Sequence, residues 1–171
     1  INIAKGIENE TLKIMSEVIF EVNGSISNYV TISGPSHAEE VVSNMPTAVV
    51  AASKNIETSK IVQGLFSTNK FRVYTNEDLI GVEICGSAKN VIAIAAGFCD
   101  GFGYGDNTKS ALITRGIKEV ARLGLKSGAK FETFFGLAGI GDIIVTCGSI
   151  HSRNRKLGER IGRGMTLGNA I

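Results

Sequence analysis

The chain has 171 residues, of which 43% are hydrophobic, so it can bury a core as one domain or as two small ones. Its formal net charge is only +2 and its basic residues are dispersed, which excludes an electrostatic argument for a nucleic-acid partner. The three cysteines have no metal-ligand spacing and no signal peptide precedes the first strand, so we expect a reduced, cytoplasmic compartment. The chain starts without Met and stops where another helix begins, and we therefore expect a piece of a longer protein.

The first 76 residues alternate short apolar strands with amphipathic helices. The pattern predicts strands at 1–4, 29–32, 47–53 and 71–74. It also predicts a helix at 10–22 and another that starts at Asn55 or Thr58 and ends at about Ser67. A further helix is expected after the turn at Gly34 and Pro35, where Ser36 is placed as the N-cap and Glu39 would complete a capping box. Alternation of this kind is typical of an α/β domain with a mainly parallel, helix-flanked sheet.

After Asn76 the pattern changes to helices alone. The sequence predicts a long central helix at 78–99, a second that starts at Asn107, a short one at 132–138, and a last one at 152–163 that is closed by Gly164. The segment 139–147 fits a strand or a helix by pattern alone. We therefore expect an α/β domain at 1–76, followed by an all-α domain at 77–171.

The longest nearly continuous apolar run, Gly81–Asn107, carries a lysine near its middle, Lys89. In a helix, the residues three and four positions away, such as Cys85 and Ile92, are the neighbours of this lysine, and they are apolar. Because burial disfavours the charged form, the pKa of Lys89 should fall, and such a lysine can exchange a proton near neutral pH. The alternative is a lysine that extends from a core helix to solvent.

Two further interpretations of this run are weaker. The run is long enough to cross a membrane, but internal charges such as Glu83 and Asp100 make insertion costly, and we expect no second spanning segment. The glycine-rich stretch 101–105 resembles a phosphate-binding loop, yet it follows a helix and lacks the third glycine of a dinucleotide-binding fingerprint. We expect it to end the helix and turn the chain.

Polar residues at the ends of several predicted elements are candidates for ligand binding. Lys5 ends a strand, and Gly34 and Ser36 lie at a strand-to-helix turn whose free N–H groups could meet an anion. Turn formation and capping are the simpler explanation of these two residues. Asp142, in a glycine-rich turn, either shapes that turn or orients a lysine by hydrogen bonding.

The segment Ser152–Asn154 opens the last predicted helix with a capping serine and an arginine in the first turn. An arginine there opposes the helix dipole, whereas a bound phosphate would be stabilised by both the arginine and the free N–H groups. The alternatives are a solvated basic face and an RNA contact, and the second lacks aromatic partners. The two histidines, His37 and His151, have no ligand spacing, so we expect no metal site.

Four blocks of the sequence resemble, in order, those of the NAD(P)-dependent glycerol-3-phosphate dehydrogenases, and the bacterial form is the more similar. The blocks are GPSHAEEV, EICGSAKNVIAIAAGFCDGFGYGDNTKSALITRG, GLAGIGDIIVTC and SRNRKLGERIGRG. The resemblance covers essentially all of 1–171 and implies the last part of a Rossmann-type, parallel-sheet domain followed by a helical substrate-binding domain. It also implies reduction of dihydroxyacetone phosphate to sn-glycerol 3-phosphate for phospholipid synthesis, with NAD or NADP as cofactor and no metal.

The resemblance assigns roles to the matched residues. Lys89 is similar to the family's general acid/base, which protonates the developing alkoxide as hydride arrives from the nicotinamide. Lys5 is similar to the lysine near both substrate and cofactor, and Asp142 to the carboxylate that positions substrate and lysine. The implied substrate-binding residues are Lys5, Gly34, Ser36, Lys89, Asn90, Asp142, Ser152, Arg153 and Asn154. The implied cofactor-binding residues are Lys5, Ala38 and Arg153.

The chain departs from the family because it lacks the N-terminal glycine-rich loop, the residue that selects NAD or NADP, and the final helices. We therefore expect the chain alone to be inactive. A homodimer is compatible with the resemblance, whereas nucleic acid and stable membrane insertion are not expected. Two other functions stay open. One is a related Rossmann-type dehydrogenase of an unphosphorylated hydroxy acid, and the other is a non-catalytic helical dimerisation module. A phosphate requirement at Ser152–Asn154 would count against both.

Overall fold

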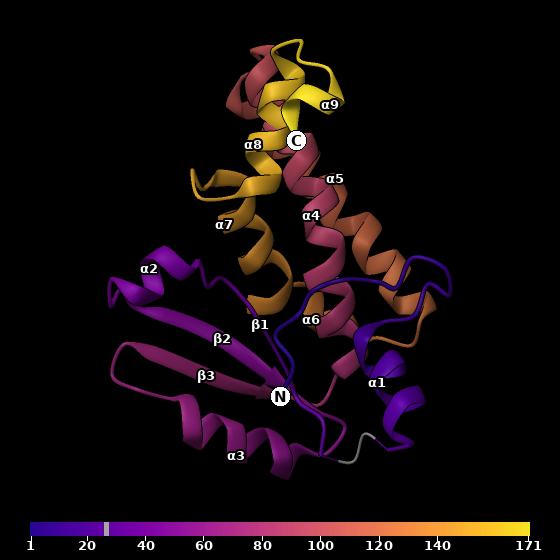
Figure 1. Ribbon diagram of the computed structural model, residues 1–171. Helices are drawn as coiled ribbons and strands as arrows, with labels where there is room; N and C mark the ends of the chain where they lie inside the picture. The colour runs from indigo at the N-terminus through magenta and orange to yellow at the C-terminus, as the bar shows by residue number, and fades with distance from the viewer. Residues whose placement is uncertain (26–27) are drawn as a thin grey trace.

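The computed structural model describes residues 1–25 and 28–171, and its first part contains a three-stranded sheet in the order β1-β2-β3 (Figure 1). β2 (Thr47–Ala52) and β3 (Phe71–Asn76) are parallel, as expected for strands joined by a helix. β1 (Thr31–Ser33) is antiparallel to β2, so this small sheet is mixed. Where the sequence predicts a strand at 1–4, a single parallel bridge joins Asn2 to Thr31.

Three helices accompany the sheet. They are α1 (Met15–Asn23), α2 (Ala38–Val42) and α3 (Ile56–Phe66). α1 begins later than its apolar period predicts, because the carboxylate of Glu8 accepts hydrogen bonds from the backbone N–H groups of Glu10 and Thr11 and holds this segment in a turn. α3 starts at the first of its two expected positions, since the side chain of Asn55 accepts a hydrogen bond from the N–H of Glu57.

The capping arrangement predicted for α2 is wrong. His37 occupies the N-cap position and makes no side-chain cap bond. The hydroxyl of Ser36 instead donates a hydrogen bond to the carbonyl of Gly34, which stabilises the turn rather than the helix. The turn leads from the carboxyl end of β1 to α2, so it places Ser36 and Gly34 at one edge of the sheet.

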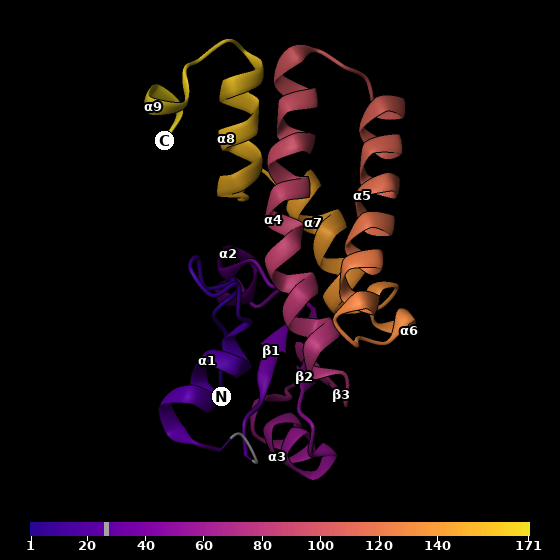
Figure 2. The same cartoon turned by 90° about the vertical axis from the view of Figure 1, so that its right-hand side faces the viewer.

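The second part of the chain is helical, and its segment 139–147 resolves as helix. The elements are α4 (Leu79–Phe102), α5 (Asp106–Lys126), α6 (Phe131–Phe134), the π-helix η1 (Leu137–Gly141), α7 (Asp142–Gly148), α8 (Arg153–Gly162) and α9 (Leu167–Ala170). The wide turn of η1 runs directly into α7. Figure 2 shows α4 between α8 and α5.

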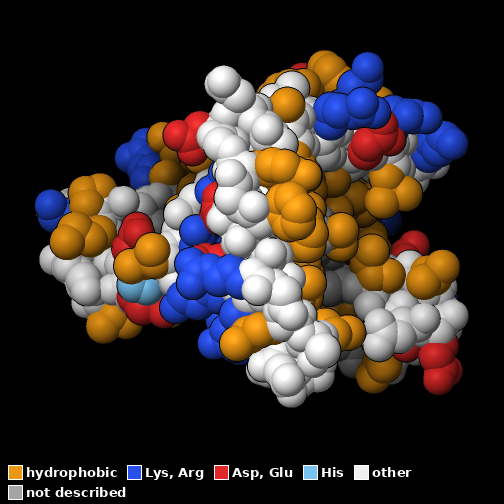
Figure 3. Space-filling view, turned by 90° about the horizontal axis from the view of Figure 1, so that it is seen from above, with side chains coloured by type: hydrophobic (Ala, Val, Ile, Leu, Met, Phe, Trp, Pro, Cys, Tyr) orange, Lys and Arg blue, Asp and Glu red, His pale blue; other side chains and the backbone are white. Residues whose placement is uncertain are grey.

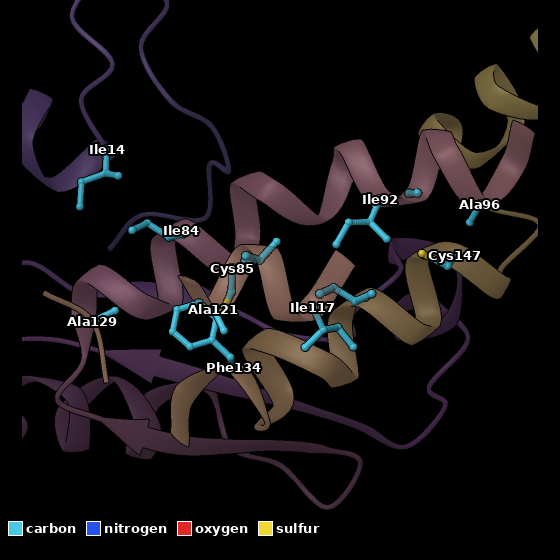
Figure 4. Close-up of a cluster of buried hydrophobic side chains, with 13 residues drawn as sticks. Ile14, Ile84, Cys85, Ile92, Ala96, Ile117, Ala121, Ala129, Phe134 and Cys147 are labelled. Atoms are coloured by element: carbon cyan, nitrogen blue, oxygen red, sulfur yellow. The ribbon is translucent and has the colours of Figure 1, made fainter. Parts of the chain in front are cut away.

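α4 is the centre of the largest core cluster, in which its apolar side chains face those of α5 and α7 (Figure 4). Asp78 caps this helix and joins it to α6. Its carboxylate, which is buried, accepts hydrogen bonds from the N–H of Gly81 at 2.9 Å, the N–H of Lys130 at 2.8 Å and the hydroxyl of Thr133 at 2.6 Å. The predicted N-cap of the central helix is therefore confirmed, and it also anchors a second element.

A second buried carboxylate, Glu83, ties α4 to the α/β part. It accepts hydrogen bonds from the N–H and the hydroxyl of Ser16, at 3.1 and 2.7 Å, and from the hydroxyl of Tyr29 at 2.6 Å. Burial and the neighbouring Glu83 both raise the pKa of Tyr29, so this phenol stays protonated and keeps its donor role. These bonds hold α1 and the start of β1 against the helix that carries Lys89.

α4 and α8 approach each other backbone to backbone along a line of glycines, which we call the glycine seam: Gly97, Gly101, Gly158 and Gly162. A Cβ atom at Gly97 would lie 1.9 Å from the carbonyl oxygen of Arg155, and one at Gly158 would lie 1.9 Å from that of Ile94. At such a distance no side chain fits, so the seam sets how close the two helices come. An ion pair between Arg155 and Asp100, at 2.7 Å, joins the same helices.

Among the residues that the structure describes, two segments are long and apolar enough to span a membrane by length and composition alone, Leu79–Phe102 and Phe131–Gly148. The sequence expectation of a single such segment is therefore wrong. In the first segment 61% of the relevant window is buried inside the protein, as it is in the core helix of many folded domains.

Candidate active site

A single carboxylate, that of Asp142, joins the two lysines singled out in the sequence. Lys5 donates a hydrogen bond to Oδ2 of Asp142 at 2.6 Å, and Lys89 donates one to Oδ1 at 2.6 Å. Asp142 is only 1% exposed at the start of α7, while Lys89 lies in α4 and Lys5 follows the bridge residue Asn2. Three distant segments therefore converge on one ionic cluster, which we call the Asp142 cluster.

Lys89 is held inside this cluster and does not extend to solvent. It is 8% exposed, and its pKa is lowered to about 8, first by desolvation and then by the positive charge of Lys5, against the opposing effect of Asp142. An ammonium with this pKa can donate a proton at neutral pH, and its conjugate base can take one back. The desolvation expected from the apolar helix is therefore present.

Thr146 is a member of the cluster that the sequence analysis missed. Its hydroxyl oxygen accepts a hydrogen bond from Lys89 at 3.0 Å and donates one to the backbone carbonyl of Asp142 at 2.6 Å. The signal was available, because a residue four positions after Asp142 lies on the same face of a helix. It could be used only once the segment 139–147 was known to be helical.

The segment predicted to bind phosphate, Ser152–Asn154, lies at the start of α8. It is beside Asn90, the residue that follows Lys89 in α4. The side chain of Ser152 caps the helix by accepting a hydrogen bond from the N–H of Arg155, as predicted. The amide of Asn154 donates a hydrogen bond to Asn90 at 2.9 Å, which fixes the distance between α8 and the face of α4 that carries Lys89. Arg153 is exposed, and in the described part of the chain it forms no ion pair.

Basic side chains follow α8 from its start to its last turn. Arg153, Lys156 and Arg160 line a groove of about 450 Å³ together with Ala170 and Ile171. Figure 3 shows Lys and Arg side chains gathered beside a histidine on the face seen from above. Arg153 and Lys156, in the first turns of α8, add positive charge where a helix N-terminus already favours an anion.

Gly34, Ser36 and Ala38 lie in the turn before α2 and at the start of that helix, and they form no hydrogen bond with the Asp142 cluster among the described residues. Gly34 is buried and has a φ of 141°, and a Cβ there would lie 3.0 Å from the Cα of Val49, so only glycine fits. Ser36 and Ala38 are exposed, at the turn and at the start of α2. The geometry therefore leaves Ser36 and Ala38 accessible to a ligand without linking them to Asp142, whereas Gly34 is enclosed.

The two histidines are closer than their sequence separation suggests. The ring centroids of His37 and His151 are 6.2 Å apart, and Nδ1 of His151 lies 3.9 Å from Oε1 of Glu39. These contacts join α2 to the loop before α8. Within residues 1–25 and 28–171, no group of three or more His, Cys, Asp or Glu side chains is arranged to hold a metal ion.

Comparison with known proteins identifies relatives of both parts of the chain. Residues 78–171 match the family model described as NAD-dependent glycerol-3-phosphate dehydrogenase C-terminus, and residues 1–59 match that of the N-terminus. The chain is 57% identical to glycerol-3-phosphate dehydrogenase [NAD(P)+] of Clostridium tetani and 59% identical to that of Clostridium botulinum, over 100% of this chain in both cases. It covers 49% and 51% of these relatives, so it spans about half their length.

Solved structures give the same result for the fold. The crystal structure of glycerol-3-phosphate dehydrogenase from Coxiella burnetii superposes with a TM-score of 0.91 at 44% identity, and the match covers 97% of this chain and 50% of that one. The glycerol-3-phosphate dehydrogenase GPD1 from Saccharomyces cerevisiae superposes with a TM-score of 0.85 at 29% identity, over 98% of this chain and 51% of that one. The predicted class, the end of a Rossmann-type domain followed by helices, is confirmed by these neighbours.

Proposed function

Because the chain belongs to the NAD-dependent glycerol-3-phosphate dehydrogenase family, we propose that the protein containing it interconverts dihydroxyacetone phosphate and sn-glycerol 3-phosphate with NAD(P)H. The observation that carries this proposal is the Asp142 cluster. Lys5 and Lys89 share one buried carboxylate, and the pKa of Lys89 is lowered to about 8. A proton donor of this kind is what the reduction of a ketone requires at neutral pH.

Lys89 acts in this proposal as the general acid of reduction and the general base of oxidation. Its ammonium gives a proton to the oxygen at C2 of the ketone, and the neutral amine takes that proton back from the alcohol. Asp142 and Thr146 hold the Lys89 nitrogen through two hydrogen bonds, of 2.6 and 3.0 Å, so that its proton points in a fixed direction. Lys5 lowers the pKa of Lys89 and stabilises the negative charge that develops on the oxygen.

The phosphate of the substrate binds at the start of α8 in this proposal. Ser152, Arg153 and Asn154 supply a hydroxyl, a guanidinium group and free backbone N–H groups at the end of a ten-residue helix. Asn90 follows Lys89 in the chain and already contacts Asn154, so the phosphate and the reacting carbon would lie side by side on α4. Gly34 and Ser36 would close the substrate site from the sheet.

In this proposal the reacting end of an NAD(P) cofactor would lie near Lys5, Ala38 and Arg153. Ala38 and Arg153 are exposed and Lys5 is partly so, which leaves room for a large ligand and a cation for its phosphates. When bound, the nicotinamide supplies the hydride to C2 in reduction and accepts it in oxidation. Among the described residues, no glycine-rich loop joins a strand to a helix as the dinucleotide fingerprint requires, so the rest of the cofactor must be held elsewhere.

We further propose that 1–76 and 77–171 are separate domains, and that the site forms where they meet. The product would serve phospholipid synthesis, and a cytoplasmic location and a homodimer are part of the proposal. It includes no metal, no nucleic-acid partner and no membrane insertion.

The test is the oxidation of NADH or NADPH with dihydroxyacetone phosphate, in a protein of the full length of the relatives. Replacing Lys89 with alanine should lower kcat at least about a hundredfold, the usual scale for a general acid–base group. Lys118→Ala, which removes an exposed lysine of α5, is the matched control and should leave kcat unchanged. An unchanged kcat in Lys89→Ala would show that this lysine is structural.

Two further comparisons separate this function from the alternatives. The 171-residue chain alone should show no turnover, and turnover at the rate of the longer protein would contradict the proposed need for a further cofactor-binding segment. Dihydroxyacetone without its phosphate should be a far poorer substrate. Equal rates with and without the phosphate would instead favour a dehydrogenase of unphosphorylated substrates.

A further inference from the structure

Ser33, the last residue of β1, carries a buried hydroxyl that has no hydrogen-bond partner in the described structure. The residue is 4% exposed, and its Oγ atom is closed to solvent. A buried polar group without a partner is unfavourable and rare in folded proteins. No group among the described residues satisfies this hydroxyl, which therefore calls for another explanation.

The surroundings of this hydroxyl place it beside the Asp142 cluster. A Cβ atom at Gly86 would lie 3.1 Å from Oγ of Ser33 and 3.3 Å from Cγ of Lys5. The hydroxyl and the stem of Lys5 therefore both face a position of α4 that has no side chain. The Lys5 side chain is 24% exposed, so it leads from this position toward solvent. A ligand that displaces the Lys5 side chain from Gly86 is therefore placed to reach Oγ of Ser33.

Three positions of α4 are used in this argument. Lys89 and Asn90 lie three and four residues after Gly86, so both are on the same face of the helix as Gly86. Asn90 contacts Asn154 in the segment proposed to bind phosphate, and Lys89 is the proposed proton donor. Ser33 lies at Gly86, on the opposite side of Lys89 from the phosphate. Gly86 and Asn90 are separated by roughly 6 Å of helix, which matches the length of a three-carbon phosphate ester.

We propose that the hydroxyl of Ser33 binds the unphosphorylated hydroxymethyl end of the substrate and so selects a 1-hydroxy ketone phosphate. The inference rests on the proposed function, because it takes the ketone to lie at Lys89 and the phosphate at Asn90 and Asn154. A substrate with its phosphate at α8 and its ketone at Lys89 directs the remaining carbon toward Ser33. The C1 hydroxyl then supplies the hydrogen bond that Ser33 lacks.

The test compares dihydroxyacetone phosphate with hydroxyacetone phosphate, which lacks only the C1 hydroxyl. In a protein of the relatives' length, kcat/KM should be about tenfold higher for dihydroxyacetone phosphate, the scale of one hydrogen bond to a buried group. Ser33→Ala should lower kcat/KM about tenfold for this substrate and leave it unchanged for hydroxyacetone phosphate, so the preference disappears. Ser59→Ala is the matched control, since Ser59 in α3 is also buried and unpartnered.

Each outcome decides the inference. Equal loss for both substrates in Ser33→Ala, or a wild-type protein without a preference, would overturn it, since the hydroxyl would then support Lys5 or the fold. Should Ser33→Ala not fold, Ser33→Cys keeps nearly the same volume with a weaker hydrogen-bonding group and must lower the preference in the same direction. A wild-type protein that reduces neither compound would refute the proposed function itself.

Discussion

Replacing Gly97 with alanine would place a methyl group where the backbone of α8 already lies. The new Cβ would be 1.9 Å from the carbonyl oxygen of Arg155, about 1.5 Å short of the 3.4 Å at which ordinary contact begins. The obstructing atom belongs to a helix backbone, so it cannot rotate away as a side chain would. α8 must move as a unit, and its N-terminal segment moves with it.

The expected size of this effect follows from the packing. Overpacking of a tight contact costs about 1–3 kcal/mol, and we expect the upper end because both partners are backbone. The 2.9 Å hydrogen bond between Asn154 and Asn90 would also be stretched, so binding at the phosphate segment should weaken. We therefore expect Gly97→Ala to lower stability by about 3 kcal/mol and to raise KM for the phosphorylated substrate more than it lowers kcat.

The assay is urea denaturation followed by circular dichroism, combined with steady-state kinetics. The matched control is Gly64→Ala in α3, where nothing lies within 4 Å of the new Cβ. That change should stabilise the protein by about 0.5–1 kcal/mol, because alanine loses less backbone entropy than glycine in a helix. Equal stability of the two variants would refute the claim that the glycine seam sets the distance between α4 and α8.

The remaining predictions concern the Asp142 cluster and the cap of α4. In the proposed mechanism reduction needs protonated Lys89, so kcat/KM for reduction should fall as pH rises through about 8, while kcat/KM for oxidation should rise. Flat pH–rate profiles from pH 6 to 10 would contradict this assignment. Asp142→Asn removes the attraction that raises the pKa of Lys89, so both profiles should shift to lower pH and kcat should fall at least about tenfold. Asp78→Ala leaves three donors without their partner, two of them buried, and should destabilise the protein by about 2–4 kcal/mol in urea denaturation. Asp106→Ala, which removes no side-chain cap bond, should cost far less.

Some local capping signals could be read from the sequence and others could not. Asn55, one of two expected starts, and Asp78 and Ser152 cap their helices through bonds between residues two or three positions apart. The caps expected at Ser36 and Asn107 are wrong, because His37 and Gly105 occupy those N-cap positions. The predicted start of α1 is too early for the opposite reason. Its apolar period continues upstream of Met15, and the turn around Glu8 that interrupts the helix is built from side-chain contacts without a periodic signal.

Only part of the candidate site could be predicted from the sequence. The desolvation of Lys89 follows from its apolar neighbours on one helix, so a local pattern was sufficient. Lys5 and Lys89 both bind the carboxylate of Asp142, from which they are 137 and 53 positions away in the sequence. No spacing rule predicts that the two lysines share this carboxylate, and only the family resemblance suggested it. Thr146 and the approach of His37 to His151 were missed because they depend on helix type and on how the two parts of the chain pack.

The π-helix η1 determines the direction in which the side chains of the following helix, α7, point. A π turn holds one residue more than the α turn it replaces, and successive residues in an α-helix are rotated by about 100°. Removing one residue from Leu137–Gly141 would let the chain relax into an ordinary α-helix and would swing Asp142 by about that angle. The carboxylate would then face away from both lysines, although every residue of the cluster would still be present. The length of this turn therefore positions Asp142 as much as any single side chain does.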